Sequence, residues 1–143
     1  METILKEFWI FSKDGTPYVN FYKENSEINQ FNFRRDDIDI KILERINSLI
    51  KTKGEELAKS KYEILEFDGF KFVITLCLNN YLFLIYKSSL SSKKKEIIKF
   101  SQVVCSMIKS LYMVKDFRFW EGDLTLFNNL KKKLDLYLKM SGL

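Results

Sequence analysis

The sequence predicts an α+β domain in which helices pack on a mainly antiparallel, five-stranded sheet. Residues 61–89 form three apolar runs separated by Asp68-Gly69 and Asn79-Asn80. Such two-residue steps readily take the positive φ angles of tight hairpins, so these runs are predicted to form an antiparallel meander. A further hairpin precedes the meander, and apolar residues at helical spacing lie before and after it. The predicted element order is therefore ββαβββαα.

The first hairpin consists of strands at residues 5–12 and 18–23, joined by a turn that contains Asp14-Gly15 and Pro17. Proline has no N–H and occurs at strand starts or sheet edges, so the second strand is predicted at an edge. Residues 8–11 and 82–85 are uninterrupted apolar runs, which are typical of strands covered on both faces. We therefore expect the first and fifth strands to be central neighbours, with the strand at 61–67 at the opposite edge.

Three helices are predicted to pack on this sheet. The first begins at Asp36-Asp37 and ends near Lys53, before Gly54; the second covers residues 93–112; the third runs from about 124 to 138, capped by Asp123. Each helix has an apolar stripe: Ile38, Ile42, Ile46, Leu49 and Ile50; then Ile97, Phe100, Val104, Ile108 and Leu111; then Phe127, Leu130, Leu134, Tyr137 and Leu138.

Length and composition indicate one domain that spans residues 1–143, with 46% hydrophobic and 15% aromatic residues. The chain contains no histidine, which removes the usual general base near neutral pH and the commonest zinc ligand. Neither of the phosphate-binding motifs GxxxxGK[ST] and GxGxxG is present. We therefore expect a protein that is not an enzyme and needs no cofactor or metal.

Cys77 and Cys105 both lie in apolar runs and lack CxxC spacing. We expect buried, reduced thiols, which indicates a cytoplasmic protein. The N-terminus lacks the basic start and uninterrupted apolar segment of a signal peptide, in agreement with that location. Residues 70–86 are short for a membrane span and carry Asn79-Asn80 at their centre, so two strands and a turn explain them better.

Particular segments resemble the longin domain family. YEILEFDGFKF (residues 62–72), followed by YLFLIY (81–86), is similar to the longin meander with its DG turn. KEFWIFSKDGTPYVNFYKE (6–24) resembles the longin first hairpin, and IIKFSQVVCSMIKSLY (97–112) resembles its second helix. The resemblance covers nearly the whole chain, and its motifs are patterns of residue class. It implies strand order 2-1-5-4-3, with one helix on one face and two on the other.

Longin domains are protein-binding modules of vesicle-trafficking and small-GTPase systems. The resemblance therefore implies an adaptor or scaffold that binds a small GTPase or a complex subunit, with homodimers or heterodimers with another longin or roadblock domain as a subordinate expectation. No SNARE heptads follow in the sequence, which favours a free-standing subunit. Most of the first helical stripe is expected to be core, so the partner-binding residues are expected at its margin and on the edge strand: Leu43, Leu49, Ile50, Tyr62 and Ile64.

Positive charge is concentrated in residues 87–118, which contain eight lysines and arginines against two acids. A basic patch of Lys93, Lys94, Lys95 and Lys99 would suit a peripheral contact with an anionic membrane or an acidic protein, although a solvated helix start explains it more simply. Nucleic acid is not expected, because the aromatic residues lie in predicted core strands and are not interleaved with the lysines.

A small-molecule sensor of the PAS or GAF type is the alternative function. Those folds also lay helices over an antiparallel sheet, but they need a cavity between the two layers. Here Phe8, Phe72, Phe83 and Phe100 would have to line such a cavity without filling it. A pocket of several hundred cubic ångströms would favour this alternative.

Overall fold

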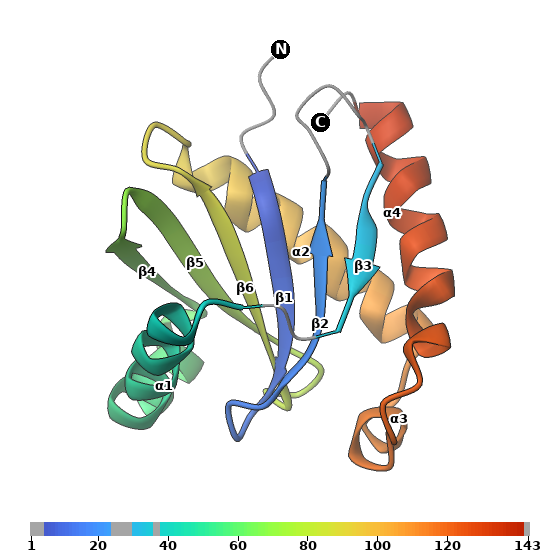
Figure 1. Cartoon of the computed structure of the whole chain (residues 1–143), viewed down its shortest axis with the longest axis horizontal. Helices are drawn as coiled ribbons and strands as arrows, with labels where there is room; N and C mark the ends of the chain where they lie inside the picture. The colour runs from blue at the N-terminus through green and yellow to red at the C-terminus, as the bar shows by residue number, and fades with distance from the viewer. Residues whose placement is uncertain (1–4, 24–29, 36–37, 142–143) are drawn as a thin grey trace.

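The computed structural model describes residues 5–23, 30–35 and 38–141. One sheet carries helices on both faces (Figure 1), so the predicted α+β class with an antiparallel sheet is confirmed. The strands are β1 (Leu5–Ser12), β2 (Pro17–Tyr22), β3 (Asn32–Arg34), β4 (Tyr62–Phe67), β5 (Phe70–Cys77) and β6 (Leu82–Ser89). The helices are α1 (Ile40–Ser60), α2 (Lys94–Leu111), α3 (Val114–Arg118), the 3-10 turn η1 (Leu124–Phe127) and α4 (Asn128–Ser141).

The strand order is β3-β2-β1-β6-β5-β4, and each neighbouring pair is antiparallel. β1 and β6 are central neighbours and β4 is an edge, as the sequence predicts. The prediction of five strands in order 2-1-5-4-3 is wrong in one respect, because β3 adds a sixth strand beside β2. A three-residue strand carries too little alternation to be recognised from sequence.

Because β3 pairs with β2, the prediction that β2 is an edge strand is also wrong. β3 pairs with Asn20, Phe21 and Tyr22 and does not reach Pro17, which pairs with Phe11 of β1. The proline therefore lies at the strand start, in a part of β2 that β3 leaves free. Pro17 thus lies at a strand start, as proline usually does, but its presence does not make the whole of β2 an edge strand.

The turns of the meander follow the predicted chemistry. Asp68 (φ 54°) and Gly69 (φ 80°) connect β4 to β5 as a two-residue hairpin turn. The second turn is longer than the predicted Asn79-Asn80 step, since Leu78, Asn79 and Asn80 all have positive φ. Cys77 and Leu82 form the last pair before it.

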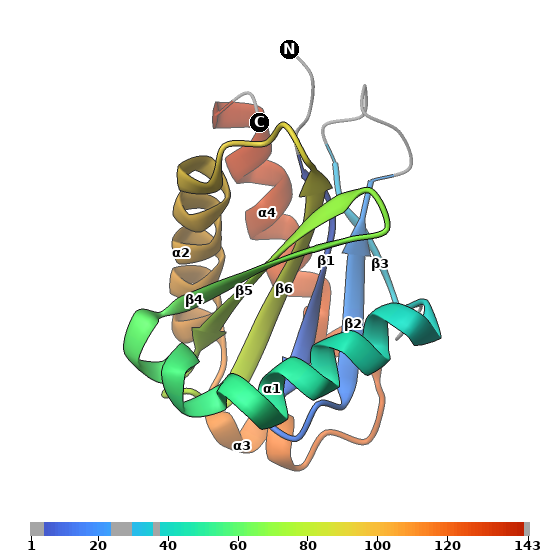
Figure 2. The ribbon, with the colours of Figure 1, turned by 90° about the vertical axis from the view of Figure 1, so that its left-hand side faces the viewer.

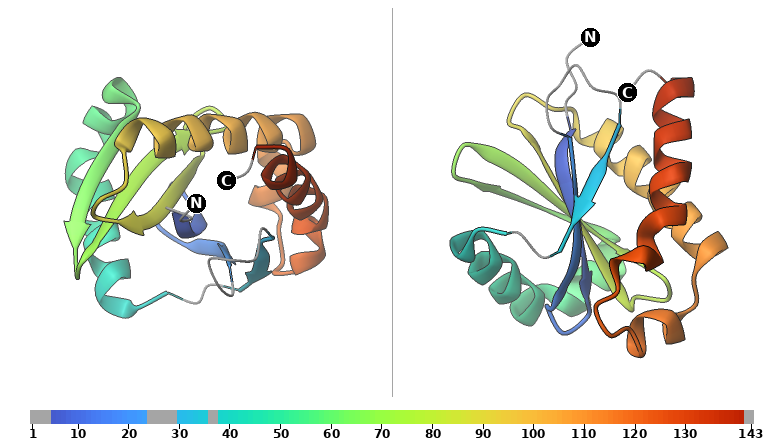
Figure 3. Two further views of the ribbon diagram at one scale, coloured as in Figure 1. Left: turned by 90° about the horizontal axis from the view of Figure 1, so that it is seen from above. Right: turned by 45° about the vertical axis from the view of Figure 1, so that its right-hand side comes forward.

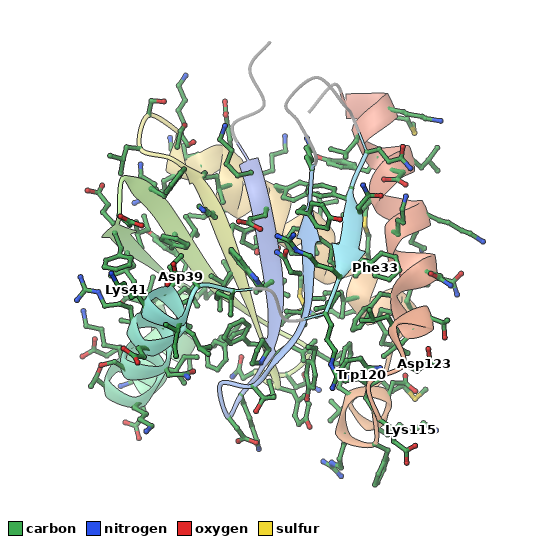
Figure 4. The ribbon with its side chains drawn as sticks, viewed as in Figure 1. Phe33, Asp39, Lys41, Lys115, Trp120 and Asp123 are labelled. Atoms are coloured by element: carbon green, nitrogen blue, oxygen red, sulfur yellow. A yellow bond between two sulfur atoms is a disulfide. The ribbon has the colours of Figure 1, made fainter. Side chains whose placement is uncertain are left out.

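Helix α1 begins later and ends later than predicted. Asp39 caps its first turn by accepting a hydrogen bond from the backbone N of Lys41 at 2.8 Å (Figure 4), whereas Asp36 and Asp37 lie outside the described residues. The helix continues through Gly54, so the predicted end at Lys53 is wrong. Leu57 is 1% exposed and extends the apolar stripe past the glycine.

Helix α2 matches the prediction for residues 93–112 within one residue at each end. The predicted third helix is divided into η1, capped by Asp123, and α4. α3 occupies part of the linking segment, where Phe117 is 2% exposed and its ring contacts Tyr18, Tyr112 and Phe127. Trp120 Nε1 donates to the Asp123 carbonyl at 2.7 Å (Figure 4), which joins the two ends of this link.

The alternation of side chains along the strands creates two cores. α1 crosses the lower part of one face (Figure 2), over a cluster that includes Trp9, Phe11, Phe72 and Phe83. α2 and α4 cover the opposite face (Figure 3), over a larger cluster that includes Phe8 and Phe100. The four phenylalanines proposed to line a sensor cavity therefore lie on opposite sides of the sheet, each at most 5% exposed, and do not line a common cavity.

Candidate functional site

The β4 strand is the most accessible long edge of the sheet. It is the terminal strand of the described sheet, six residues long, and it contains no proline and no bulge in its pairing with β5. The opposite edge, β3, has only three residues. Natural proteins commonly shorten, bend or cover such edges, so an uninterrupted one is a ready template for another strand.

The backbone groups of even-numbered β4 residues point away from β5. In a two-residue hairpin the residues that flank the turn, Phe67 and Phe70, form the hydrogen-bonded pair, and the pairs then alternate. Ser60 Oγ donates to the Tyr62 carbonyl at 3.0 Å, which agrees with an outward direction for Tyr62. The N–H and C=O groups of Ile64 and Glu66 therefore face outward, beyond the ladder with β5.

The structure divides the five predicted partner-binding residues into two groups. Leu43, Leu49 and Ile50 are half-buried against the cluster under α1. Ile64 packs against the cluster under α2, and Tyr62 also points to that side. Neighbouring residues of a strand alternate in direction, so it is Leu65 and Phe67 that share a face with the α1 residues. The two groups meet only along the β4 backbone.

A groove lies between the start of β4 and helix α2, here called the α2 groove. Its volume is about 560 Å³. Its lining exposes more apolar than polar surface, and its polar groups include the hydroxyl groups of Ser60, Thr75, Ser101 and Ser106 and the ammonium groups of Lys61 and Lys109. Thr75 and Ser101 are hydrogen-bonded to each other at its base. The groove is open at the molecular surface, and none of Phe8, Phe72, Phe83 and Phe100 lines it. Its volume is of the size that would favour the PAS or GAF alternative, which stays a prediction.

Tyr86 is fully buried beside this base. Burial raises the pKa of its phenol, an effect that the nearby Ser101 hydroxyl opposes in part. Ser101 is already engaged with Thr75, and the Tyr86 hydroxyl has no hydrogen bond of ordinary geometry within the described ranges. A buried hydroxyl without a hydrogen bond lowers the free energy of unfolding, although polar groups lie nearby at the base of the α2 groove.

Cys77 and Cys105 form a disulfide that joins β5 to α2, so the prediction of two reduced thiols is wrong, and the two cysteines give no support to a cytoplasmic location. Their Cα atoms are 5.6 Å apart, within the range that a disulfide requires. The sequence could not show this, because the cysteines are 28 residues apart and become neighbours only when α2 packs on the sheet. Cys77 is 3% exposed, whereas Cys105 is half-buried and lines the α2 groove.

The basic patch lies at the start of α2, and Lys93, Lys94, Lys95 and Lys99 are all exposed. Lys94 Nζ lies 5.1 Å from the ring centroid of Tyr62, which is within the range of a cation–π contact. The structure thus brings one basic-patch residue to one predicted partner-binding residue, at the α2 side of β4. The other three basic-patch residues extend into solvent.

Sequence reasoning missed a charged network on the α1 side of the sheet. Glu7 accepts a hydrogen bond from Asn20 Nδ2 at 3.1 Å and forms ion pairs with Arg34 at 3.7 Å and Lys87 at 3.6 Å. Arg34 stacks on Tyr22 and Lys87 on Phe70. The alternation of side chains along β1 could have indicated this network, because it places Glu7 on the same face as the buried Trp9 and Phe11. The mutual pairing of these charges favours a structural role.

Within the described ranges, no group of three or more metal-binding side chains is found, and no helix is long and apolar enough to cross a bilayer. The predicted absence of a metal, an enzyme activity and a cofactor is not tested by these observations. Comparison with protein-family models and with curated proteins gives no match for this chain.

Proposed function

We propose that this protein is a non-catalytic, longin-like adaptor or scaffold of a small-GTPase or trafficking-type complex, acting in the cytoplasm. Its partner adds an extended strand to β4. The observation that carries this proposal is the β4 edge, with outward-facing backbone groups at Ile64 and Glu66 and half-exposed apolar side chains on both faces. Strand addition uses the backbone groups for affinity and the alternating side chains for specificity.

Each face of β4 offers a different contact to an added strand. On one side Leu65 and Phe67 continue into Leu49 and Ile50 of α1. On the other side Ile64 and Tyr62 lead to the α2 groove. Full burial of one such side chain contributes about 1.5–3 kcal/mol, so two or three of them, together with the backbone hydrogen bonds of an added strand, slightly outweigh the cost of association. A transient complex is the expected result.

The occupant that we propose is an extended segment of a different protein with a basic side chain opposite Glu66. Glu63 and Glu66 are the charged residues of β4, and Glu66 is exposed. Opposite charges that face each other across neighbouring strands are stabilising, so an added strand with lysine or arginine at that position is preferred. A second copy of this chain is the other occupant, and the test below distinguishes it.

Ile64→Pro tests the edge directly. Proline at this position removes an N–H that points outward and leaves the ladder with β5 intact, so the fold should persist. In titrations of the isotope-labelled chain with purified small GTPases and longin or roadblock domains, we expect the amide signals of Ile64 and Glu66 to shift. The variant should bind at least about tenfold more weakly, since it loses a hydrogen bond and blocks strand pairing.

Leu65→Pro is the matched control, because its N–H points toward β5. It should lower the free energy of unfolding, whereas Ile64→Pro should not. Sedimentation equilibrium on the unmodified chain decides whether a second copy occupies the edge; a dimer that Ile64→Pro disrupts would identify that occupant. Binding that leaves the β4 amide signals unchanged, or no binding to any candidate, would contradict the proposal.

A further inference from the structure

We propose that the α2 groove is a thiol-exchange site, at which an anionic low-molecular-weight thiol of the glutathione type attacks Cys105 and forms a mixed disulfide with it. This inference is independent of the proposed strand addition at β4. It rests on the position of the disulfide, the lining of the groove and the unequal exposure of the two sulfur-bearing residues.

Access to the disulfide is one-sided. Cys105 is half-buried and lines the α2 groove, while Cys77 is 3% exposed beneath it. In thiol–disulfide exchange the sulfur that is attacked depends on which one the incoming thiolate can reach. A thiol that enters the α2 groove therefore meets Cys105, and Cys77 becomes the leaving group.

The charge of the groove favours an anionic thiol. Lys61 and Lys109 line it, and no aspartate or glutamate is found among the described residues that do so. Lys109 follows Cys105 by four residues on α2, so the two side chains are neighbours on the same helix face. Lys94, stacked on Tyr62, adds a third positive charge beside the same groove. The carboxylates of a glutathione-type tripeptide would find ammonium groups next to the sulfur that its thiolate attacks.

The size and polarity of the groove also suit such a peptide. A volume of about 560 Å³ lies within the usual range for small-molecule sites. The exposed Ser106 and Gln102 and the α1 residue Ser60 offer hydrogen-bonding groups along the groove. These groups can pair with the amide and carboxylate groups of a peptide, and the larger apolar part of the lining can pack against its methylene groups.

The exchange step needs no oxidant or reductant other than the incoming thiol. The incoming thiolate forms a bond to Cys105 Sγ, the Cys77–Cys105 bond breaks, and its electron pair leaves on Cys77 Sγ, which takes a proton from solvent. Cys77 Sγ lies 3.6 Å from the Cys105 carbonyl oxygen, so the released thiol has an acceptor at hydrogen-bonding distance. In the reverse step Cys77 attacks the mixed disulfide, restores the original bond and releases the thiol.

The test compares an anionic with a neutral thiol on the full chain. The oxidised protein is incubated with glutathione or with 2-mercaptoethanol, quenched by acid, alkylated and analysed by peptide mass spectrometry. If the chain is isolated in its reduced form, oxidised glutathione is added instead, and attack of the Cys105 thiolate on it gives the same mixed disulfide. We expect the glutathione adduct on Cys105, with exchange faster than that of the neutral thiol at equal thiolate concentration.

Charge reversal at the groove separates selectivity from simple accessibility. Lys109→Glu should lower the rate with glutathione by about tenfold and change the rate with 2-mercaptoethanol little. Lys139→Glu, on the exposed face of α4, is the matched control and should leave both rates unchanged. An adduct on Cys77, an equal effect of Lys109→Glu on both thiols, or no adduct in either direction would overturn the proposal.

Discussion

The contact between Gly15 and Asn47 shows how closely the β1–β2 turn approaches α1. Gly15 has φ +90°, and a Cβ at this position would overlap Oδ1 of Asn47. The Asn47 oxygen is buried and has no hydrogen-bond partner in the described part of the chain. The sequence predicted this turn from Asp14-Gly15, but the approach of a helix from the next element cannot be read from turn chemistry.

Gly15→Ala should therefore lower the free energy of unfolding by about 1–2 kcal/mol from the left-handed backbone, and further by the cost of displacing the Asn47 amide at the end of its side chain. Urea unfolding measures the loss. Gly69→Ala is the matched control, because Gly69 has φ +80° but no atom within 4 Å of the added Cβ. It should lose only the backbone part, about 1–2 kcal/mol. Equal losses in the two variants would show that the turn does not press on α1.

At the scale of elements, α1 shows how packing overrides a local stop signal. Gly54 predicts a helix end, and a glycine inside a helix costs about 1 kcal/mol relative to alanine. Burial of Leu57, on the same stripe as Ile42 and Ile46, contributes about 1.5–3 kcal/mol and outweighs that cost. The helix ends instead at Ser60, and the capping residue Lys61 has φ 72° and donates its N–H to the Leu57 carbonyl.

Gly54→Ala should raise the free energy of unfolding by about 0.5–1 kcal/mol, because the added methyl group meets no atom within 4 Å and the residue is helical. Thermal or urea unfolding of the variant beside the parent chain measures the gain. A loss of stability would show that α1 is interrupted at this residue, as the sequence alone suggested.

The candidate edge was predictable as an element but not in its detail. The meander and the edge position of β4 follow from the turns at Asp68-Gly69 and Asn79-Asn80 and from the apolar runs. The predicted set of partner-binding residues combined the two faces of β4, because Tyr62 and Ile64 were grouped with α1 without regard to the alternation of a strand. Leu65 and Phe67 occupy the positions beside α1 that the prediction assigned to Tyr62 and Ile64.

Across the whole molecule, buried tyrosines make stability sensitive to alkaline pH. Burial raises the pKa of Tyr18 and of Tyr112 to about 12, from an ordinary value of 10. Between these values the unfolded chain has lost the phenolic protons that the folded chain still holds, so stability falls as pH rises from about 10 to 12. Burial lowers the pKa of Lys23 to about 8, which raises stability between about pH 8 and 10.5.

We therefore expect the free energy of unfolding to pass a maximum near pH 10 and then to fall. Urea unfolding at a series of pH values measures this dependence. In Tyr112→Phe the fall above pH 10 should be shallower, since one of the phenols is absent. An unchanged slope in the variant would mean that Tyr112 ionises equally in the folded and unfolded chains.

The long-range contacts are what the sequence could not supply. Apolar runs indicate which strands are central, but the disulfide between Cys77 and Cys105 depends on how α2 docks on the sheet. The α+β class and the neighbouring positions of β1 and β6 followed from local patterns. The disulfide and the α2 groove each require residues that are distant along the chain, whereas the sixth strand was missed because it has only three residues.

Phe31, just before β3, donates its N–H to Oδ1 of Asp135 in α4 at 3.0 Å, across 104 residues. β1 lies between β2 and β6 in the sheet. Its partner β6 ends only at Ser89, whereas β1 already ends at Ser12. During synthesis the ribosome releases β1 long before its partner β6, and Phe31 long before its anchor Asp135. The sheet can therefore form before α4 is available to cover it, and a nascent chain halted before α4 would expose to chaperones the hydrophobic surface that α4 covers.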